Sequence, residues 1–289
     1  MKKFIAVLMS LLMLLAFAAC TDTTNDESTD VIDTTDEATV EADVTEDAEQ
    51  VTFTVGFDAE FPPFGFIADD GSYDGFDLAL AEEVCNRLGW TFVAQPIVWD
   101  SKDLELANGN IDCIWNGFTM SEDRIDQYTW TDAYYDNSIV MVVSADSGIE
   151  SLADLAGKNV AVQAASSALE ALNKEENAEL LASFNDLIES ADYNNAFMEL
   201  EQGTADAVAV DYGVALYNMA TKEEGQFVIL DEAVSSEQYG IAFLLGNDEL
   251  AATVWEQVEA IAADGTMAAI AANYEDVGLD SSALVLLAE

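Results

Sequence analysis

The sequence predicts an α/β protein made of two similar halves, and two observations support this prediction. Between residues 51 and 115, β-branched runs alternate with amphipathic helical segments in the order β-α-β-α-β. The same alternation begins again near residue 139. Strands that alternate with helices form parallel sheets through right-handed crossovers. We see no repeat of fixed period. Because the two halves have a similar order of elements, we expect two α/β lobes.

The first half contains three expected strands and two expected helices. The alternating β-branched run VTFTVG predicts the first strand. Apolar residues recur at helical spacing within residues 75–88, namely Leu78, Ala81, Val84, Cys85 and Leu88. The other strands are expected at 91–99 and 111–115, with a short helix at 104–108.

The second half repeats this order, and three further elements follow it. Helices are expected at 152–155, from 167 onward and at 197–202, and strands at 159–162 and 206–210. The later elements are a strand and two helices, at 238–245, 251–264 and 267–273. The second of these helices is short and rich in alanine.

The N-terminus has the layout of an export signal. Residues 1–19 join two lysines to a continuous apolar stretch, with small residues before Cys20. The sequence FAAC is similar to a bacterial lipoprotein signal, in which Cys20 becomes the lipidated N-terminus. Phe17 departs from the usual leucine, and an ordinary secretory signal without a role for Cys20 is the alternative.

Residues 20–50 are expected to form a disordered tether. The segment from Thr21 to Gln50 holds twelve Asp or Glu and no Lys, Arg or aromatic residue. Such a segment cannot bury enough apolar surface to offset its ordering entropy, and its like charges repel one another. The remaining chain, from about Val51, is long enough for two modest domains.

The charge of the chain excludes several classes of function. A formal net charge of −49 argues against nucleic acid and against unaided binding to anionic lipid, since both require basic patches. Such acidity is also found on proteins that work in high salt, which screens charge repulsion. The sequence has no histidine, so it has no His-based triad or His metal site, and we expect neither a metal nor a cofactor. With Cys20 lipidated, Cys85 and Cys113 are either a disulfide pair or two separate buried thiols.

A series of short motifs resembles the amino-acid-binding family of bacterial solute-binding proteins, the receptor subunits of ABC importers. In chain order they are VGFDAEFPPFGF, GFDLALAEEV, VWD, GNIDCIWNGFTMSEDR, TDAYYDNS, LAGKNVAVQAASSALE, ADAVAVDYGVALY, QYGIAF and ADGTMAAI. The resemblance extends from Val51 to about Tyr274. It implies a two-lobe, type II periplasmic-binding-protein-like fold whose lobes close on a ligand by hinge motion.

Chain order then suggests the lobe boundaries. Lobe 1 is expected to be discontinuous, at 51–133 and 240–278, and lobe 2 to span 139–234. The hinge strands would be 134–138 and 235–239, and residues 279–289 would form a C-terminal tail.

A free amino acid is a zwitterion, and the resemblance supplies candidates for each of its groups. Arg124 is one of only two arginines in the chain. A guanidinium binds a carboxylate through two parallel hydrogen bonds, and the family pattern places its carboxylate-binding arginine here. The alternative is a surface arginine paired with Glu122 or Asp126. Asn116, Gly117 and Thr119 resemble the family's donors and acceptors to both α-groups, although Asn-Gly also forms plain turns.

The second half provides the opposite side of the expected site. Ser166 and Ser167 lie where a strand gives way to a helix, and a helix N-terminus attracts a carboxylate. Simple helix capping is the alternative for these serines. Asp211 follows the apolar run AVAV and resembles the family's ammonium-binding aspartate.

Four more residues are candidates for the side-chain pocket. Phe61 and Trp99 resemble aromatic walls, whereas aromatic residues elsewhere are mostly core. Asp58 and Gln163 are candidates for polar contacts with the distal end of the ligand. Asp58 alternatively caps the loop before Pro62.

Together these features predict a receptor without catalytic activity. It would bind a free amino acid, polar or cationic in preference to large aliphatic, and deliver it to the membrane subunits of an ABC importer. We expect a monomer, held outside the cytoplasmic membrane by its lipid, at a Gram-positive surface rather than in a periplasm. An enzyme on the same scaffold, dehydratase-like or peptidoglycan-cleaving, and a sensor or adhesin subunit are the alternatives.

Overall fold

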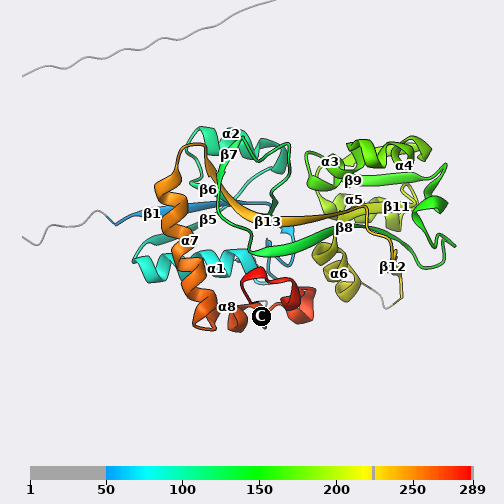
Figure 1. Cartoon of the computed structure of the whole chain (residues 1–289). Helices are drawn as coiled ribbons and strands as arrows, with labels where there is room; N and C mark the ends of the chain where they lie inside the picture. Colours follow the sequence, from blue (N-terminus) through cyan, green and yellow to red (C-terminus); the bar gives the residue numbers. More distant parts are fainter. Residues whose placement is uncertain (1–49, 223–224, 288–289) are drawn as a thin grey trace, which may run out of the picture. The chain divides into compact units, whose positions relative to one another are not determined.

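A mixed sheet of ten strands runs through the described part of the protein and connects its two halves (Figure 1). The computed structural model describes residues 50–222 and 225–287. The main path of the sheet has the order β10-β9-β11-β8-β13-β6-β1-β5, while β12 pairs with β8 and β7 pairs with β13. A separate three-stranded sheet has the order β2-β3-β4.

The strands have the following bounds: β1 Thr52–Phe57, β2 Glu60–Phe61, β3 Gly65–Ile67, β4 Tyr73–Asp74, β5 Thr91–Pro96, β6 Cys113–Thr119, β7 Tyr128–Trp130, β8 Tyr135–Ser144, β9 Asn159–Gln163, β10 Asp186–Ser190, β11 Ala207–Asp211, β12 Phe227–Ile229 and β13 Ser235–Leu244. The α-helices are α1 Phe76–Leu88, α2 Lys102–Ala107, α3 Ser167–Asn173, α4 Ala178–Ser183, α5 Tyr193–Glu201, α6 Tyr212–Thr221, α7 Asp248–Ala263 and α8 Thr266–Ala271.

The first lobe, which we call lobe 1, comprises β1 to β7, α1, α2, α7 and α8. Its central strand β1 pairs in parallel with both β5 and β6, as the β-α-β-α-β order predicts. Helix α1 packs against β5 and β6 and contacts α7 and α8. The apolar stripe expected on this helix is largely buried, including Leu78, Ala81, Val84 and Cys85.

The second lobe, lobe 2, comprises β9 to β12 and α3 to α6. Strand β9 pairs in parallel with both β10 and β11. Helices α3 and α5 contact β9 and β11, while α6 packs against β8. The second half is therefore also an α/β unit with parallel strands.

Two long antiparallel strands connect the lobes. Residues 135–139 of β8 pair with residues 235–239 of β13, from Tyr135↔Tyr239 to Ser235↔Ile139. Beyond this ribbon, β8 continues along β11 in lobe 2, and β13 continues along β6 in lobe 1. The fold is thus the expected two-lobe α/β architecture joined by two strands.

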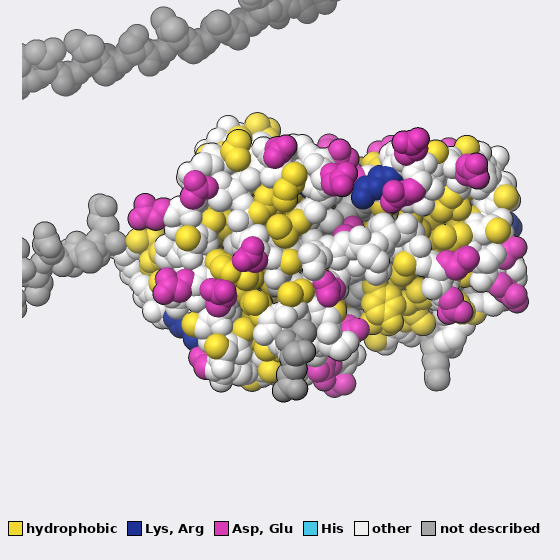
Figure 2. Space-filling model, in the orientation of Figure 1, with side chains coloured by type: hydrophobic (Ala, Val, Ile, Leu, Met, Phe, Trp, Pro, Cys, Tyr) yellow, Lys and Arg dark blue, Asp and Glu magenta, His cyan; other side chains and the backbone are white. Residues whose placement is uncertain are grey.

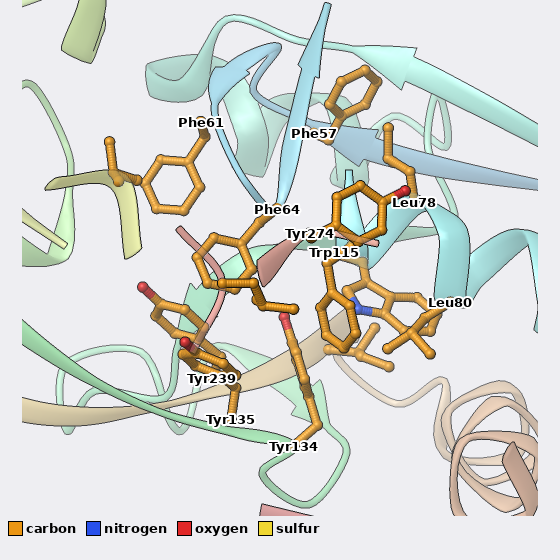
Figure 3. Packing of buried hydrophobic residues seen from close by; sticks show 14 of the residues in the cluster. Phe57, Phe61, Phe64, Leu78, Leu80, Trp115, Tyr134, Tyr135, Tyr239 and Tyr274 are labelled. Carbon is orange, nitrogen blue, oxygen red and sulfur yellow. The ribbon is translucent and has the colours of Figure 1, made fainter. Parts of the chain in front are cut away.

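Aromatic side chains pack at the lobe 1 end of this ribbon (Figure 3). Phe64 meets Tyr135 and Tyr239 edge-on, each with ring centroids 5.2 Å apart. The two tyrosines lie on opposite strands and stack with an interplanar angle of 14°. Since all three rings are buried, the ribbon is firmly attached to lobe 1.

The described part of the C-terminal segment packs against the same ribbon. Leu284 forms a β-bridge with Tyr135, and the Val285 amide donates to the Tyr134 carbonyl at 3.0 Å. Leu279 and Leu284 are buried. The segment that we expected to form a tail therefore packs onto the core through Leu279 and Leu284.

Two expected strands have different ends in the structure. The strand predicted at 111–115 is β6, which begins at Cys113 and continues to Thr119. Asn116 and Gly117 therefore lie within a strand instead of a turn, because β13 pairs with β6 up to Thr119↔Tyr239 through an irregular register near Gly240. The strand predicted at 91–99 ends at Pro96, where the missing N–H interrupts the ladder, and Trp99 begins a short 3₁₀-helix.

One helix and two strands differ from the expected bounds by a few residues. Helix α5 begins at Tyr193 instead of 197, because the Asp192 carboxylate accepts from the Asn195 amide at 2.8 Å. Strands β9 and β11 each extend by one residue, to Gln163 and Asp211. Both extensions place a candidate site residue at the end of a strand.

Cys85 and Cys113 are both free and buried. Of the two alternatives for these cysteines, the structure has the separate thiols and lacks the bridge. Burial raises the pKa of the Cys85 thiol to about 11 and that of Cys113 well above its usual range. Both are therefore held as neutral, unreactive core residues.

The signal peptide, Cys20 and the tether up to residue 49 lie outside the described residues. Within residues 50–222 and 225–287, no helix combines the length and the apolar character that a bilayer span requires. Figure 2 shows Asp and Glu side chains scattered over the visible face, with few Lys or Arg between them. The acidity of the folded part is thus largely a surface property.

Candidate ligand-binding site

The candidate residues lie at strand ends and helix starts, and every one of them is buried. Lobe 1 contributes Asp58, Phe61, Trp99, Asn116, Gly117, Thr119 and Arg124. Lobe 2 contributes Gln163, Ser166, Ser167 and Asp211. Open α/β sheets bind their ligands beyond the carboxyl ends of the strands. Most of these polar side chains meet between the lobes.

Arg124 follows β6 and reaches across to lobe 2. Its Nη1 donates to the Thr119 carbonyl at 3.5 Å, and its Nη2 donates to the Ala165 carbonyl of lobe 2 at 3.3 Å. Its Cζ lies 4.7 Å from the centre of the Phe118 ring, in cation–π contact. Nη2 also forms an ion pair of 2.5 Å with Glu170 of α3. The structure therefore pairs Arg124 with neither Glu122 nor Asp126.

Glu237, on the connecting strand β13, joins both lobes. Its Oε1 accepts hydrogen bonds from the Thr119 hydroxyl at 2.8 Å and the Ser167 hydroxyl at 3.2 Å. The same oxygen accepts from Asn137 Nδ2 at 2.8 Å. Burial, followed by the nearby Asp211 charge, raises the pKa of Glu237 to about 8. Neither Glu237 nor Asn137 was among the residues expected from the sequence.

Asp211 lies at the end of β11 and is fully partnered. Its Oδ1 accepts from the Tyr239 hydroxyl at 2.6 Å and from Asn137 Nδ2 at 2.9 Å. Its Oδ2 accepts from the Tyr193 hydroxyl at 3.1 Å. Burial raises the pKa of Asp211, while the tyrosine hydrogen bonds oppose that shift. Side-chain hydrogen bonds thus link Thr119, Glu237, Asn137 and Asp211 in a continuous chain. Arg124 lies at the Thr119 end of this chain, where it contacts the backbone carbonyl.

Asp58 and Gln163 form a second contact between the lobes. Gln163 Nε2 donates to Asp58 Oδ2 at 2.6 Å. The other oxygen of Asp58 accepts from the Glu60 amide at 2.9 Å, which is a local loop contact. Asn116 supports this arrangement because its Oδ1 accepts from the Asp58 amide at 2.9 Å. Asp58 therefore caps its own loop, as one of the two alternatives expected, and also contacts Gln163 of lobe 2. Its contact with the distal end of a ligand stays a prediction.

Three candidate residues have clear structural roles. Ser166 is the N-cap of α3, because its hydroxyl accepts from the Leu169 amide at 3.1 Å. Gly117 has a φ of +56°, and a Cβ there would lie 2.8 Å from Phe61 Cε1. Trp99 packs edge-on against Phe118 in a cluster separate from that of Phe61. The aromatic partners of Phe61 are instead Phe64 of lobe 1, at 5.8 Å, and Tyr193 of lobe 2, at 5.9 Å.

Two further buried charges support the site. Lys102, at the start of α2, has its Nζ 3.5 Å from the Ala165 carbonyl and 5.2 Å from the centre of the Trp99 ring. Burial, and then the Arg124 charge, lower the pKa of Lys102. Asp77 accepts from the Gly117 amide at 2.6 Å and the Tyr134 hydroxyl at 2.7 Å, and burial raises its pKa to about 7. Asp77 thereby holds the strand that carries Asn116 and Thr119.

One sequence signal would have found Lys102. The argument from scarcity that pointed to Arg124 applies equally to one of only six lysines, placed three residues after Trp99. No comparable signal distinguishes Glu237 or Asp77 among 57 acidic residues.

Two cavities border the connecting ribbon. A crevice of about 140 Å³ lies between the lobes and is lined by Thr119, Ser167, Glu170 and Glu237, among others. A larger groove of about 890 Å³ has walls that include Tyr212, Ile229, Asp231 and Asp280. This larger groove is also lined by Tyr135, Asn137 and Glu237. We place the candidate site at the smaller crevice because Thr119 and Ser167 line it. Its walls also include Glu170, which pairs with Arg124, and Glu237, which accepts from Asn137. In the described ranges, no group of acidic or cysteine side chains is placed to hold a metal ion.

Two α/β lobes, two connecting strands and a polar site between the lobes define the class of type II periplasmic binding proteins. The chain belongs to the bacterial extracellular solute-binding proteins, family 3, whose sequence profile matches residues 53–276.

Curated relatives and solved structures agree with this assignment. The chain is 27% identical over 228 residues to the L-cystine-binding protein TcyJ of Escherichia coli, covering 78% of this chain and 83% of that protein. It is 28% identical over 224 residues to ABC transporter arginine-binding protein 1 of Escherichia coli, covering 76% and 88%. An ABC uptake transporter substrate-binding protein from Streptococcus pneumoniae with bound histidine superposes with a TM-score of 0.74, 29% identity, and 80% and 94% coverage. An ancestral arginine-binding protein bound to glutamine superposes with a TM-score of 0.71 and 33% identity, covering 78% of this chain and 98% of that one.

Proposed function

We propose that this protein is the amino-acid receptor of an ABC importer. The observation that carries the proposal is the hydrogen-bonded chain of side chains from Thr119 to Asp211, which has the Arg124 cation beside its first member and the buried Asp211 carboxylate as its last. Arg124 and the hydroxyls of Thr119 and Ser167 would bind the α-carboxylate of the ligand. Asp211 and Glu237 would bind its α-ammonium group. The relatives named for cystine and arginine, and the structures with histidine and glutamine, support an amino acid as the ligand.

We further propose a polar or cationic amino acid in preference to an acidic or aliphatic one. The carboxylates of Asp58 and Asp211 are buried between the lobes, as are the cations Arg124 and Lys102. Beside Asp58, the rings of Phe61 and Tyr193 offer an apolar wall and Gln163 offers an amide. An acidic side chain would meet the Asp58 carboxylate there. Arginine, lysine, glutamine and cystine therefore rank above glutamate, aspartate and leucine.

The location and role that we propose follow from the family and from the N-terminal sequence. Lipidation of Cys20 would anchor the receptor outside the cytoplasmic membrane, at a Gram-positive surface in preference to a periplasm. Residues 51–133 with 240–278 would form one moving lobe and residues 139–234 the other, with the ribbon of β8 and β13 as the hinge. The receptor would act as a monomer without catalytic activity or cofactor.

A thermal-shift screen of the twenty amino acids and cystine tests the proposal. A ligand at 100 times its Kd adds about 2.7 kcal/mol to the stability of a protein that binds it only when folded. We expect a clear upward shift of Tm with arginine, lysine, glutamine or cystine. The absence of a shift with any amino acid would contradict the proposed function. Recovery of the bound amino acid unchanged, by mass spectrometry, separates a receptor from an enzyme.

A further inference from the structure

We propose that Glu170 latches the two lobes together through its ion pair with Arg124, and that its carboxylate competes there with the α-carboxylate of the ligand. This inference rests on the proposed function in one respect, the assignment of the ligand's α-carboxylate to Arg124. It adds an affinity-determining residue that lies on α3 of lobe 2. The geometry of the guanidinium is the reason.

A guanidinium has two edges that can hold a carboxylate through paired hydrogen bonds, Nε with Nη2 and Nη1 with Nη2. Both edges therefore use Nη2. In the structure, Nη2 of Arg124 is 2.5 Å from Glu170 Oε1 and donates to the Ala165 carbonyl at 3.3 Å. A second carboxylate can bind Arg124 with paired hydrogen bonds only when one of these partners withdraws.

Glu170 is the partner that can withdraw. The Ala165 carbonyl belongs to the backbone just before α3 and also accepts from Lys102 Nζ at 3.5 Å. The Glu170 side chain is 27% exposed, whereas the Arg124 side chain is only 5% exposed. Its second oxygen accepts from the Ser121 hydroxyl at 2.9 Å, a contact that also crosses between the lobes. Glu170 thus has water within reach and occupies the position at Arg124 that a ligand carboxylate requires.

The crevice beside Arg124 leads to the same inference. Glu170 is one wall of the crevice of about 140 Å³, together with Thr119, Ser121 and Glu237. Binding sites for small molecules commonly measure about 300–1,000 Å³. Withdrawal of Glu170 would release Arg124 and enlarge this space in a single movement.

The latch has a defined effect on affinity. A receptor whose binding-competent state is only partly populated shows an apparent Kd that is raised by the reciprocal of that fraction. As long as Glu170 occupies Arg124, the competent fraction is small. Replacing Glu170 removes the competitor, and the ligand carboxylate then binds Arg124 without displacing a charge.

Calorimetry with Glu170→Gln tests the competition. We expect Glu170→Gln to bind L-arginine at least fivefold more tightly than the unchanged protein does. If L-glutamine or cystine binds best in the screen, that amino acid replaces L-arginine as the probe. The matched control is Glu176→Gln, which removes the same charge from an exposed position in lobe 2 and should leave the affinity unchanged. L-Argininamide, or the α-amide of whichever probe is used, lacks the carboxylate. Its Kd should therefore differ less than twofold between Glu170→Gln and the unchanged protein. Weaker or unchanged binding of the acid by Glu170→Gln, or an equal gain for the amide, would overturn the proposal.

A second measurement is independent of ligand recognition and therefore separates failure of the latch from failure of the proposed function. Hydrogen exchange without added amino acid should be faster in Glu170→Gln than in Glu176→Gln within residues 119–127 and 163–173, because the lobes lose an ion pair between them. Equal exchange in the two variants would contradict the latch, even if no amino acid binds. The proposed function is tested separately: it is supported if an amino acid binds the unchanged protein but does not bind Arg124→Ala.

Discussion

The two ends of the candidate site are built differently. At the Asp211 end, a buried carboxylate accepts from Tyr193, Tyr239 and Asn137, and these partners are buried as well. At the Arg124 end, the charge is paired with the partly exposed Glu170 and with a backbone carbonyl. The comparison teaches that the anionic end is fixed in advance by its neighbours, whereas the cationic end holds a partner that can be exchanged.

The largest expected effect is that of Asp211→Ala. The substitution leaves the hydroxyls of Tyr193 and Tyr239 and the amide of Asn137 without their acceptor. Each buried group without a partner costs about 1–3 kcal/mol, so the free energy of unfolding should fall by several kcal/mol, as measured by urea denaturation. Amino-acid binding should weaken at least tenfold in calorimetry. Unchanged affinity in the folded variant would remove Asp211 from the ligand site.

Arg124→Ala should separate binding from stability. Removing one partner of a desolvated charge pair typically costs about 2–5 kcal/mol of binding. The free energy of unfolding should fall less than in Asp211→Ala, because Glu170 is partly exposed and can be solvated. The other arginine is the matched control: Arg87 pairs with Glu83 and Asp264 on the surface, and Arg87→Ala should bind as the unchanged protein does. Arg124→Ala that binds normally would refute the assignment of the cationic end.

Gly117→Ala tests the strand that both ends share. A non-glycine residue in the left-handed region costs roughly 1–2 kcal/mol, and overpacking adds about 1–3 kcal/mol. The new Cβ would lie 2.8 Å from Phe61 and 3.0 Å from Tyr239. Gly203→Ala is the control, since its φ is +71° and nothing lies within 4 Å of its Cβ. Denaturation should show the larger loss for Gly117→Ala; equal losses would mean that the cleft is not tightly packed there.

Glu237→Gln should alter the pH dependence of stability. The pKa of Glu237 is raised from 4.5 to about 8, so between these values the folded protein retains a proton that the unfolded chain has released. The free energy of unfolding therefore falls as the pH rises through this window, by at most about 1.4 kcal/mol per pH unit for one proton. The variant should show a flatter profile between pH 5 and 8 than Glu176→Gln. Parallel profiles would show that Glu237 is ionised in the folded protein.

The smallest effect is expected for Ala165→Gly. Ala165 has a φ of +56°, a conformation that costs roughly 1–2 kcal/mol for a residue with a side chain. Glycine removes this strain from the folded protein, but it also raises the conformational entropy of the unfolded chain, which offsets part of the gain. We therefore expect the free energy of unfolding to rise by up to about 1 kcal/mol, with a higher Tm. The geometry of the carbonyl that accepts from Arg124 and Lys102 should be retained. A lower Tm would indicate that the Ala165 methyl group contributes packing at the cationic end.

The sequence by itself determined the two α/β halves and the resemblance to solute-binding proteins, and it singled out Arg124 and Asp211 as candidate site residues. These features are local: a helical stripe such as Leu78 to Cys85, an apolar run before Asp211, and an arginine in a chain that has only two. Periodicity and scarcity can be read without knowing which segments meet.

Only the tertiary structure decided what these residues contact. The strand β6 continues through Asn116 and Gly117 because β13, more than a hundred residues later, pairs with it. Glu237 enters the site because the same strand crosses from one lobe to the other, and Glu170 reaches Arg124 because α3 faces lobe 1 across the crevice. Among 57 acidic residues no local pattern distinguishes these two, since the environment of a carboxylate depends on the neighbours that folding brings to it.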